Sequence, residues 1–225
     1  MGIIITGILS ILMTLLTYYG SYAGNFIVII DSRERISSIV LSENSDFDDP
    51  APRLFANSVN DSPPLAYYDI KVQDAVLQDG NYDDPDFQYF AYSFYLKNNG
   101  NQILNVEAKY LITDVIRNSD KAIRIIVVKN EDLDTMEVYQ KEDTVEWNYP
   151  PNYPETKHFE NTDEGLVFTE NIEDFYPGQI IKYTVINYVE GYDPDCDDSI
   201  AGGLIKMTMR FSIMSHIDPD EIEEA

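Results

Sequence analysis

The sequence predicts an all-β protein with an antiparallel two-sheet sandwich, and three observations support this fold class. Tyr (17 residues) far outnumbers Trp (1), and β-branched and aromatic residues dominate the apolar runs, a balance typical of strands. Apolar and polar residues alternate along several short segments, and no amphipathic helical pattern is longer than two turns. Clusters of Gly, Pro, Asn and Asp separate these segments. Roughly nine or ten short strands divided by turns are typical of a sandwich.

The first 30 residues carry no charge, and Asp31 is the first ionisable side chain. The apolar run 3–19 approaches the ~20 residues that cross a bilayer, and Ser21 and Ala23 are small residues of the kind that signal peptidase prefers. Residues 1–23 are therefore predicted to be an apolar helix, either a signal peptide or a membrane anchor. The sequence leaves its cleavage and the true start codon open.

Beyond this helix we expect one domain. Residues 24–215 are predicted to form the sandwich, with an acidic, Pro-rich surface loop at 43–66 and an acidic tail at 216–225. The predicted strands before the last one are 25–31, 36–42, 67–77, 89–97, 102–115, 122–130, 135–141, 165–172 and 180–190.

Two of these predictions concern how strands are arranged. The turn Asn98-Asn99-Gly100-Asn101 contains Asn-Gly, which readily adopts the positive φ angles of a tight hairpin, so segments 89–97 and 102–115 are expected to pair antiparallel. The last strand has the clearest alternation. One face is expected to carry Ile205, Met207, Met209, Phe211 and Ile213.

Charge narrows the classes of partner. Forty acidic and fifteen basic residues give a formal net charge of −25, which repels phosphate backbones, so nucleic acid is excluded as a partner. The expected partner is another protein or a second copy, bound by strand addition, and the membrane is contacted only through residues 1–23 if they are retained. We expect an extracytoplasmic location, either secreted or anchored at the cell surface.

An acidic loop, Asp-Pro-Asp-Cys-Asp-Asp, interrupts the apolar pattern before the last strand. Asp193, Asp195 and Asp197, with Asp198 beside them, offer hard oxygen ligands, the first three at alternate positions as at the start of a calcium-binding EF-hand loop. Glu190 or the loop 79–86 could complete a cage of another kind. An EF-hand loop needs Gly at its sixth position and Glu at its twelfth, where this chain has Asp198 and Leu204. A calcium site and a solvated inter-strand loop both stay open, and no other cofactor is expected.

Cys196 lies within this loop and is the single cysteine of the chain, so it forms no intrachain disulfide. The surrounding carboxylates are expected to raise the pKa of its thiol, which argues against a thiolate nucleophile.

Two segments carry a family resemblance. Residues 92–130, with a strand that ends in Lys-Asn-Asn-Gly before a second strand, resemble exported proteins of the TasA and camelysin-like group. Residues 174–211, with Pro-Gly, Glu-Gly, Asp-Pro-Asp-Cys and Gly-Gly in order, look like the C-terminal part of small Gram-positive surface proteins of that group. This resemblance implies a secreted or membrane-anchored jelly-roll-like sandwich, which in some relatives polymerises into biofilm-matrix fibres by strand donation.

Two functions follow. The first is a non-enzymatic surface or matrix protein that acts in adhesion or in envelope or biofilm structure, with a strand such as 25–31 adding to an open sheet edge. The alternative, implied by the camelysin-like relatives, is a metal-dependent hydrolase. A zinc site would have to use His158 and His216, because the chain has no His-Glu-x-x-His motif. No catalytic residues are assigned, and we expect no enzymatic activity.

Overall fold

The computed structural model describes Gly7, Ser10 and residues 25–31, 38–59, 62–145 and 148–217. The predicted apolar helix 1–23 lies outside this part of the chain apart from Gly7 and Ser10, and so does the tail from residue 218. Within the described ranges, no helix has both the length and the apolar character needed to cross a bilayer.

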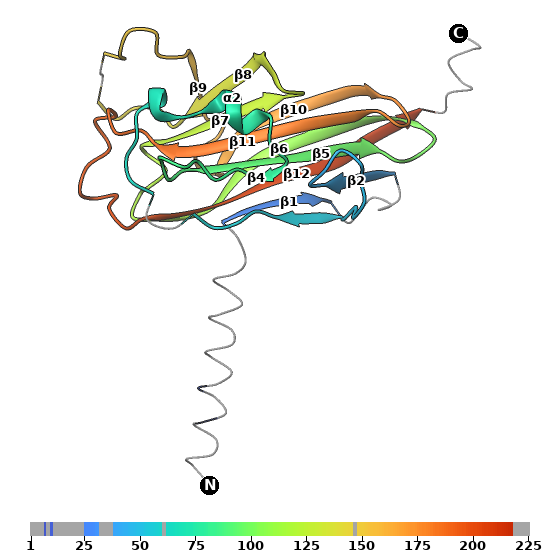
Figure 1. The fold of residues 1–225 in the computed structure, drawn as a ribbon, viewed down its shortest axis with the longest axis horizontal. Coiled ribbons are helices and arrows are strands. Elements are labelled where there is room, and N and C mark those ends of the chain that lie inside the picture. The colour runs from blue at the N-terminus through green and yellow to red at the C-terminus, as the bar shows by residue number, and fades with distance from the viewer. Residues whose placement is uncertain are drawn as a thin grey trace.

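Strands dominate the described residues and form two sheets that pack as a sandwich (Figure 1). Sheet A has the order β10-β6-β12-β1-β3, with bounds Leu166–Phe175, Ile103–Ile116, Leu204–Ile217, Phe26–Ile30 and Arg53–Phe55. Sheet B has the order β2-β5-β11-β7-β8-β9, with bounds Ile39–Ser42, Phe90–Asn98, Ile180–Val189, Ile123–Lys129, Asp132–Gln140 and Thr156–His158. The short β4 (Gly80–Asn81) also pairs with β5. The predicted sandwich is confirmed.

The sheets are mixed, so the prediction of purely antiparallel sheets is wrong. β1 runs parallel to β12, and β9 runs parallel to β8. Parallel neighbours need long connections, and in both pairs the two strands are separated by more than a hairpin turn. Alternation along a strand predicts its faces but carries no information on the direction of its neighbours.

The predicted hairpin between 89–97 and 102–115 is also wrong, because β5 and β6 belong to different sheets. Both edges of β5 are occupied by β2 and β11, which leaves none for β6. The buried Asn98 side chain instead holds an arch between the sheets, since its Nδ2 donates to the carbonyl oxygens of Gln102 (2.8 Å) and Phe175 (2.7 Å). Neither Asn99 nor Gly100 has a positive φ.

A tight hairpin joins β7 to β8 at a sequence without glycine. Asn130 and Glu131 have φ angles of 53° and 62°, the left-handed pair that suits the twist of a two-residue hairpin. Asn is one of the residues that adopts this conformation readily, whereas Glu is not. The Oδ1 atom of Asn130 accepts the Lys182 N–H (3.0 Å), so the turn is also fixed to β11.

The segment predicted as a strand at 67–77 is helical. It contains the 3₁₀ helix η1 (Tyr67–Asp69) and the short helix α2 (Val72–Val76). The buried side chains of α2 are Val72, Ala75 and Val76, a spacing of three and four residues that suits one helical face. Over so few residues this spacing is easily mistaken for alternation.

The acidic loop predicted at 43–66 is more ordered than a surface loop. It contains β3, and Ala51 pairs with Leu41 of sheet B while Leu54 of β3 pairs with Val28 of sheet A. The segment therefore closes one side of the sandwich, where the edges of the two sheets meet.

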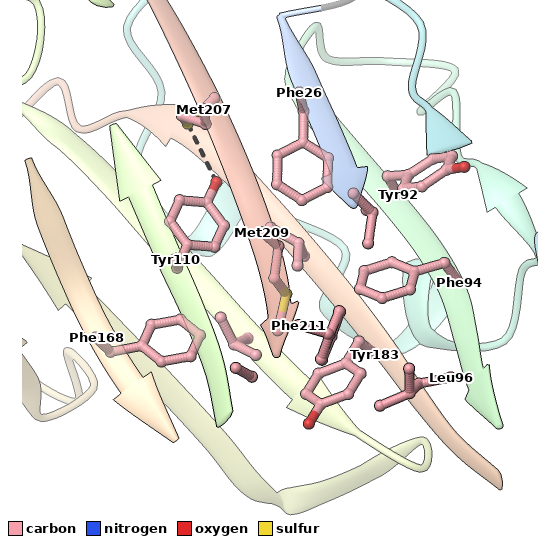
Figure 2. Packing of buried hydrophobic residues seen from close by; sticks show 14 of the residues in the cluster. Phe26, Tyr92, Phe94, Leu96, Tyr110, Phe168, Tyr183, Met207, Met209 and Phe211 are labelled. Atoms are coloured by element: carbon pink, nitrogen blue, oxygen red, sulfur yellow. Dashed lines mark hydrogen bonds between the residues drawn. The ribbon is translucent and has the colours of Figure 1, made fainter. Parts of the chain in front are cut away.

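The main hydrophobic core lies between the sheets (Figure 2). The predicted inner face of the last strand is confirmed: Ile205, Met207, Met209 and Phe211 are buried, and Ile213 is partly buried and packs against the cluster. Phe211 meets Phe94 and Tyr183 of sheet B at ring-centroid distances of 6.1 and 5.7 Å. A second cluster lies on the outer face of sheet B, where α2 packs over β5 and β11.

Candidate functional site

The acidic loop that connects β11 to β12 is a chain of tight turns. The N–H of Cys196 donates to the carbonyl oxygen of Asp193 (2.9 Å), and the N–H of Gly203 donates to that of Ile200 (2.9 Å). Gly203 lies so close to its neighbours that a Cβ there would come within 2.6 Å of the Ser119 Cβ. These turns direct the side chain of Asp193 inward.

Asp193 forms an ion pair with Arg124 of β7, with 2.8 Å between Nη2 and Oδ2 and no exposure of either side chain. Arg124 pairs in register with Tyr188 of β11, so its side chain belongs to the covered outer face of sheet B. Burial raises the pKa of Asp193 above its ordinary value, while the Asp195 N–H and Arg124 oppose that shift. The buried guanidinium supplies the positive charge that this carboxylate needs.

Glu190 is the second carboxylate of the cluster, and it is fully buried. Its Oε2 accepts hydrogen bonds from the hydroxyls of Tyr153 (2.8 Å) and Tyr188 (3.2 Å), and its Oε1 accepts the N–H of Tyr192 (3.1 Å). The Nε of Arg124 donates to the Tyr153 hydroxyl (3.2 Å). Burial raises the pKa of Tyr188 far above its ordinary value, so its hydroxyl stays a donor.

The remaining predicted ligands point elsewhere. Asp195 accepts hydrogen bonds from the N–H of Thr144 (3.0 Å) and from its hydroxyl, and these hold the pKa of Asp195 below its ordinary value although burial opposes the shift. Asp197 accepts the N–H of Ser199 (2.7 Å), which lowers its pKa. Asp198 is exposed. The structure therefore links Glu190 to Asp193 through Tyr153 and Arg124. Asp195, Asp197 and Asp198 are not part of this cluster.

This geometry bears on the calcium hypothesis. Within the described part of the chain, no group of three or more Asp, Glu, His or Cys side chains is arranged to hold a metal ion. The guanidinium of Arg124 already supplies a positive charge to Asp193, and it is linked to Glu190 through the Tyr153 hydroxyl. Calcium at Asp193, Asp195, Asp197, Asp198 and Glu190 stays a prediction, and the contacts favour a structural loop.

Cys196 is half-buried, and burial followed by Asp193, Glu190 and Asp197 raises the pKa of its thiol, as the sequence predicts.

The two histidines lie at opposite ends of the sandwich. His158 of β9 pairs in register with Gln140, near the end where β5 begins, whereas His216 of β12 pairs with Leu104, beyond the end of β5. Nine residues of β5 separate these ends, about 30 Å at the rise of a strand. Figure 1 shows β9 and the C-terminal end of β12 far apart. The residues present do not fit a zinc site that uses both histidines.

A cleft of about 290 Å³ lies between β8, β9 and β10, on the side of the sandwich opposite β3. Its charged side chains are paired: Lys129 with Glu170 (2.6 Å) and Lys157 with Glu137 (2.6 Å). Glu160 accepts hydrogen bonds from the N–H and the hydroxyl of Thr169 of β10, so a side chain covers part of the exposed edge of that strand. These charged side chains are therefore used in contacts between β8, β9 and β10.

The strand expected to mediate strand addition is β1, and it fills a slot in its own chain. β1 lies between β12 and β3, with Phe26 opposite Met207 and Val28 opposite Met209. Both side chains are fully buried, and the Phe26 ring lies 5.6 Å from that of Tyr110 and 6.2 Å from that of Tyr92 (Figure 2).

Sequence reasoning missed Arg124, Tyr153 and Tyr188. One signal was available: Arg124 is the single charge inside the apolar run Ala-Ile-Arg-Ile-Ile-Val-Val. A charged residue within a strand that is buried on both faces requires a buried counter-charge. The identity of that partner depends on the fold, since Asp193 is 69 residues further along the chain.

Comparisons with known proteins leave the family open. No family model matches the chain, and no curated protein matches it. Among solved structures, the chain is similar to a β-glucosidase from Kluyveromyces marxianus in complex with glucose, with 12% identity, a TM-score of 0.28, and coverage of 91% of this chain and 19% of that one. The selenomethionine-labelled form of that enzyme gives 12% identity, a TM-score of 0.27, and coverage of 91% and 20%. The chain spans about a fifth of that enzyme's length, and likeness at this TM-score carries no argument.

Proposed function

We propose that this protein is a non-enzymatic surface or matrix protein that acts outside the cytoplasm, in adhesion or in envelope or biofilm structure. Its sandwich would assemble by strand addition through β1. The resemblance to the TasA and camelysin-like group, with its jelly-roll-like fold, supports this proposal and is itself part of what we propose. The net charge of −25 suits a soluble domain in an aqueous exterior.

The observation that carries the proposal is the position of β1. It is five residues long, and it enters sheet A parallel to β12 without a hairpin to either neighbour. A strand held in this way can be replaced by the same strand of a second copy, with identical contacts to β12 and β3. Exchange that is passed on from copy to copy forms open chains of subunits, whereas reciprocal exchange between two copies closes a dimer.

The test is cysteine cross-linking of full-length protein in mild non-ionic detergent. Ile27 and Thr208 are neighbours in the β1–β12 register, so Ile27→Cys and Thr208→Cys in a Cys196→Ser background place two thiols side by side. After assembly at high concentration and oxidation, strand addition predicts a ladder of covalent oligomers. Covalent monomers within large assemblies would exclude exchange of β1, and the absence of assemblies would exclude a self-assembling matrix role.

The alternative hydrolase makes a different prediction. It requires stoichiometric zinc in the purified protein, which elemental analysis of the same sample measures. No contact in the described part of the chain favours that reading over assembly.

A further inference from the structure

The outer face of sheet A carries a row of cations in a strongly acidic protein. The strand registers place Arg53 beside Ile29, Ile29 beside Arg210, and Arg210 beside Lys109, across β3, β1, β12 and β6. The row therefore uses three of only 15 basic residues in the chain.

Among the described residues, Lys109 is the one cation of this row that has a carboxylate partner. The Arg210 side chain forms no ion pair or hydrogen bond with any described residue, and Arg53 lies over the ring of Phe55 (5.9 Å). Lys109 pairs with Glu107 (2.7 Å). Like charges directly opposite on neighbouring strands destabilise a sheet, so the Arg210–Lys109 neighbours are unfavourable. Arg210 makes no ion pair or hydrogen bond with a described residue that would offset this cost.

An apolar row lies next to the cations. Phe55, Ile27, Thr208 and Leu111 are neighbours in the same four strands, two residues along. The Phe55 side chain is 49% exposed, which is a large apolar surface beside Arg53. This face therefore suits a partner that is both acidic and apolar.

A surface on the opposite side of the molecule carries both acidic and apolar side chains. A groove of about 370 Å³ runs between η1, α2 and β8, and its apolar lining includes Tyr68, Leu133 and Met136. Asp74 and Lys71 line the same groove, and Lys71 is neutralised by Asp86 (2.6 Å). The exposed Asp132 and Asp134 flank Leu133 in the chain. The exposed fractions of Tyr68 and Leu133 are 54% and 37%.

We propose that the outer face of sheet A docks onto the groove between α2 and β8 of a second copy of this chain. The arginines of one copy lie against Asp74 and the β8 carboxylates of the next, and Phe55 enters the groove. Charge complementarity between the two faces of one molecule selects a second copy as the occupant. At 0.15 M salt the Debye length is about 8 Å, so repulsion between the net charges is largely screened while these close pairs still interact.

The size and geometry of the face fit this contact. The five strands hold 46 residues, which at a rise of about 3.3 Å and a spacing of about 4.8 Å give a face of roughly 700 Å², close to the ~800 Å² per partner of a stable interface. The two surfaces lie on opposite sides of the sandwich and differ from each other, so the contact is head-to-tail and repeats without closing. This inference rests on the assembly function proposed above but uses residues outside the inner face of β1.

The test is sedimentation velocity of full-length protein in 0.15 M salt and mild non-ionic detergent, with Arg210→Glu, Asp74→Lys and an equimolar mixture of the two. Each variant alone is expected to weaken association at least tenfold. The mixture is expected to associate again, because the intact groove of the first variant meets the intact cationic face of the second. The matched control is Lys157→Glu, which makes the same charge change on β9, away from both surfaces, and should shift the dissociation constant less than twofold.

Unchanged association of Arg210→Glu would overturn the proposal, and so would a mixture that stays monomeric. If Arg210→Glu shows a lowered melting temperature, Arg210→Thr replaces it, with the same expected loss of association. The face contact should disappear in 0.5 M salt and on dilution, whereas exchanged β1 strands should survive both. A salt-resistant ladder of cross-linked oligomers without salt-sensitive association would therefore refute the face contact and leave strand addition standing.

Discussion

Basic side chains have opposite surroundings on the two outer faces of the sandwich. On sheet B, η1, α2 and the loops cover the face, and Arg124 is buried against Asp193. On sheet A, Arg210 stays unpaired among the described residues, next to a second cation. A charged side chain in a strand thus stabilises the fold where a covering layer supplies its partner, and it is available for binding where no layer covers it.

The largest effect should come from the tyrosines under the covering layer, on raising the pH. Burial, followed by the neighbouring polar groups, raises the pKa of Tyr89 and Tyr188 well above the ordinary value of 10.0. Their contribution to stability is fully present below pH 10 and is lost as pH rises above it, because only the unfolded chain then ionises freely. Each such hydroxyl costs about 1.4 kcal/mol per pH unit.

We therefore expect cooperative unfolding above pH 10, measured by circular dichroism together with tyrosinate absorbance. Ionisation of all tyrosines near pH 10 with the fold intact would contradict this expectation. The outer face of sheet A has no tyrosine on β1, β3 or β12, so it contributes nothing to this transition.

Removal of Arg124 should have the next largest effect. Arg124→Met leaves Asp193 and Glu190 buried without a counter-charge, which should lower the free energy of unfolding by about 3–5 kcal/mol in urea denaturation. The double variant Arg124→Met with Asp193→Leu should recover part of that loss. Lys157→Met, which breaks the exposed pair with Glu137, should cost less than ~1 kcal/mol. Equal losses for the two single variants would show that the buried pair has no special role.

A smaller effect is expected from the loop that carries Asp193. Gly203→Ala would bring a Cβ within 2.8 Å of the carbonyl oxygens of Ile116 and Ile200, and the required shift should cost about 2–3 kcal/mol. Gly178→Ala is the matched control: its φ of 79° is strained for Ala, but no atom lies within 4 Å, so the loss should be only about 1–2 kcal/mol. Thermal denaturation of both variants compares the loss of stability from a steric clash at residue 203 with the loss from backbone strain alone at residue 178.

The smallest effect, and one of opposite sign, is expected on the bare face. Arg210→Thr removes a cation opposite Lys109 and leaves no buried group unpaired, so stability should rise by about 0.2–1 kcal/mol. Urea denaturation measures this change. A loss above ~1 kcal/mol would mean that Arg210 is a structural residue like Arg124.

The sequence predicted part of the candidate site. It located the acidic loop and the direction of the pKa shift of Cys196, although burial raises that pKa more than the neighbouring carboxylates do, and burial could not be seen in the sequence. It could not separate Asp193 from Asp195 and Asp197, although only the first is buried against a guanidinium. That distinction depends on which side chain the turns point inward, and the composition of the loop contains no such information.

Local alternation and composition were enough to predict the all-β class, the inner face of the last strand and the net charge of −25. Three features could be known only from the fold: β5 and β6 lie in different sheets, β1 runs parallel to β12, and Arg124 pairs with Asp193. A strand's faces are set by its own residues, whereas its neighbours and its buried counter-charges depend on competition among segments far apart in the chain.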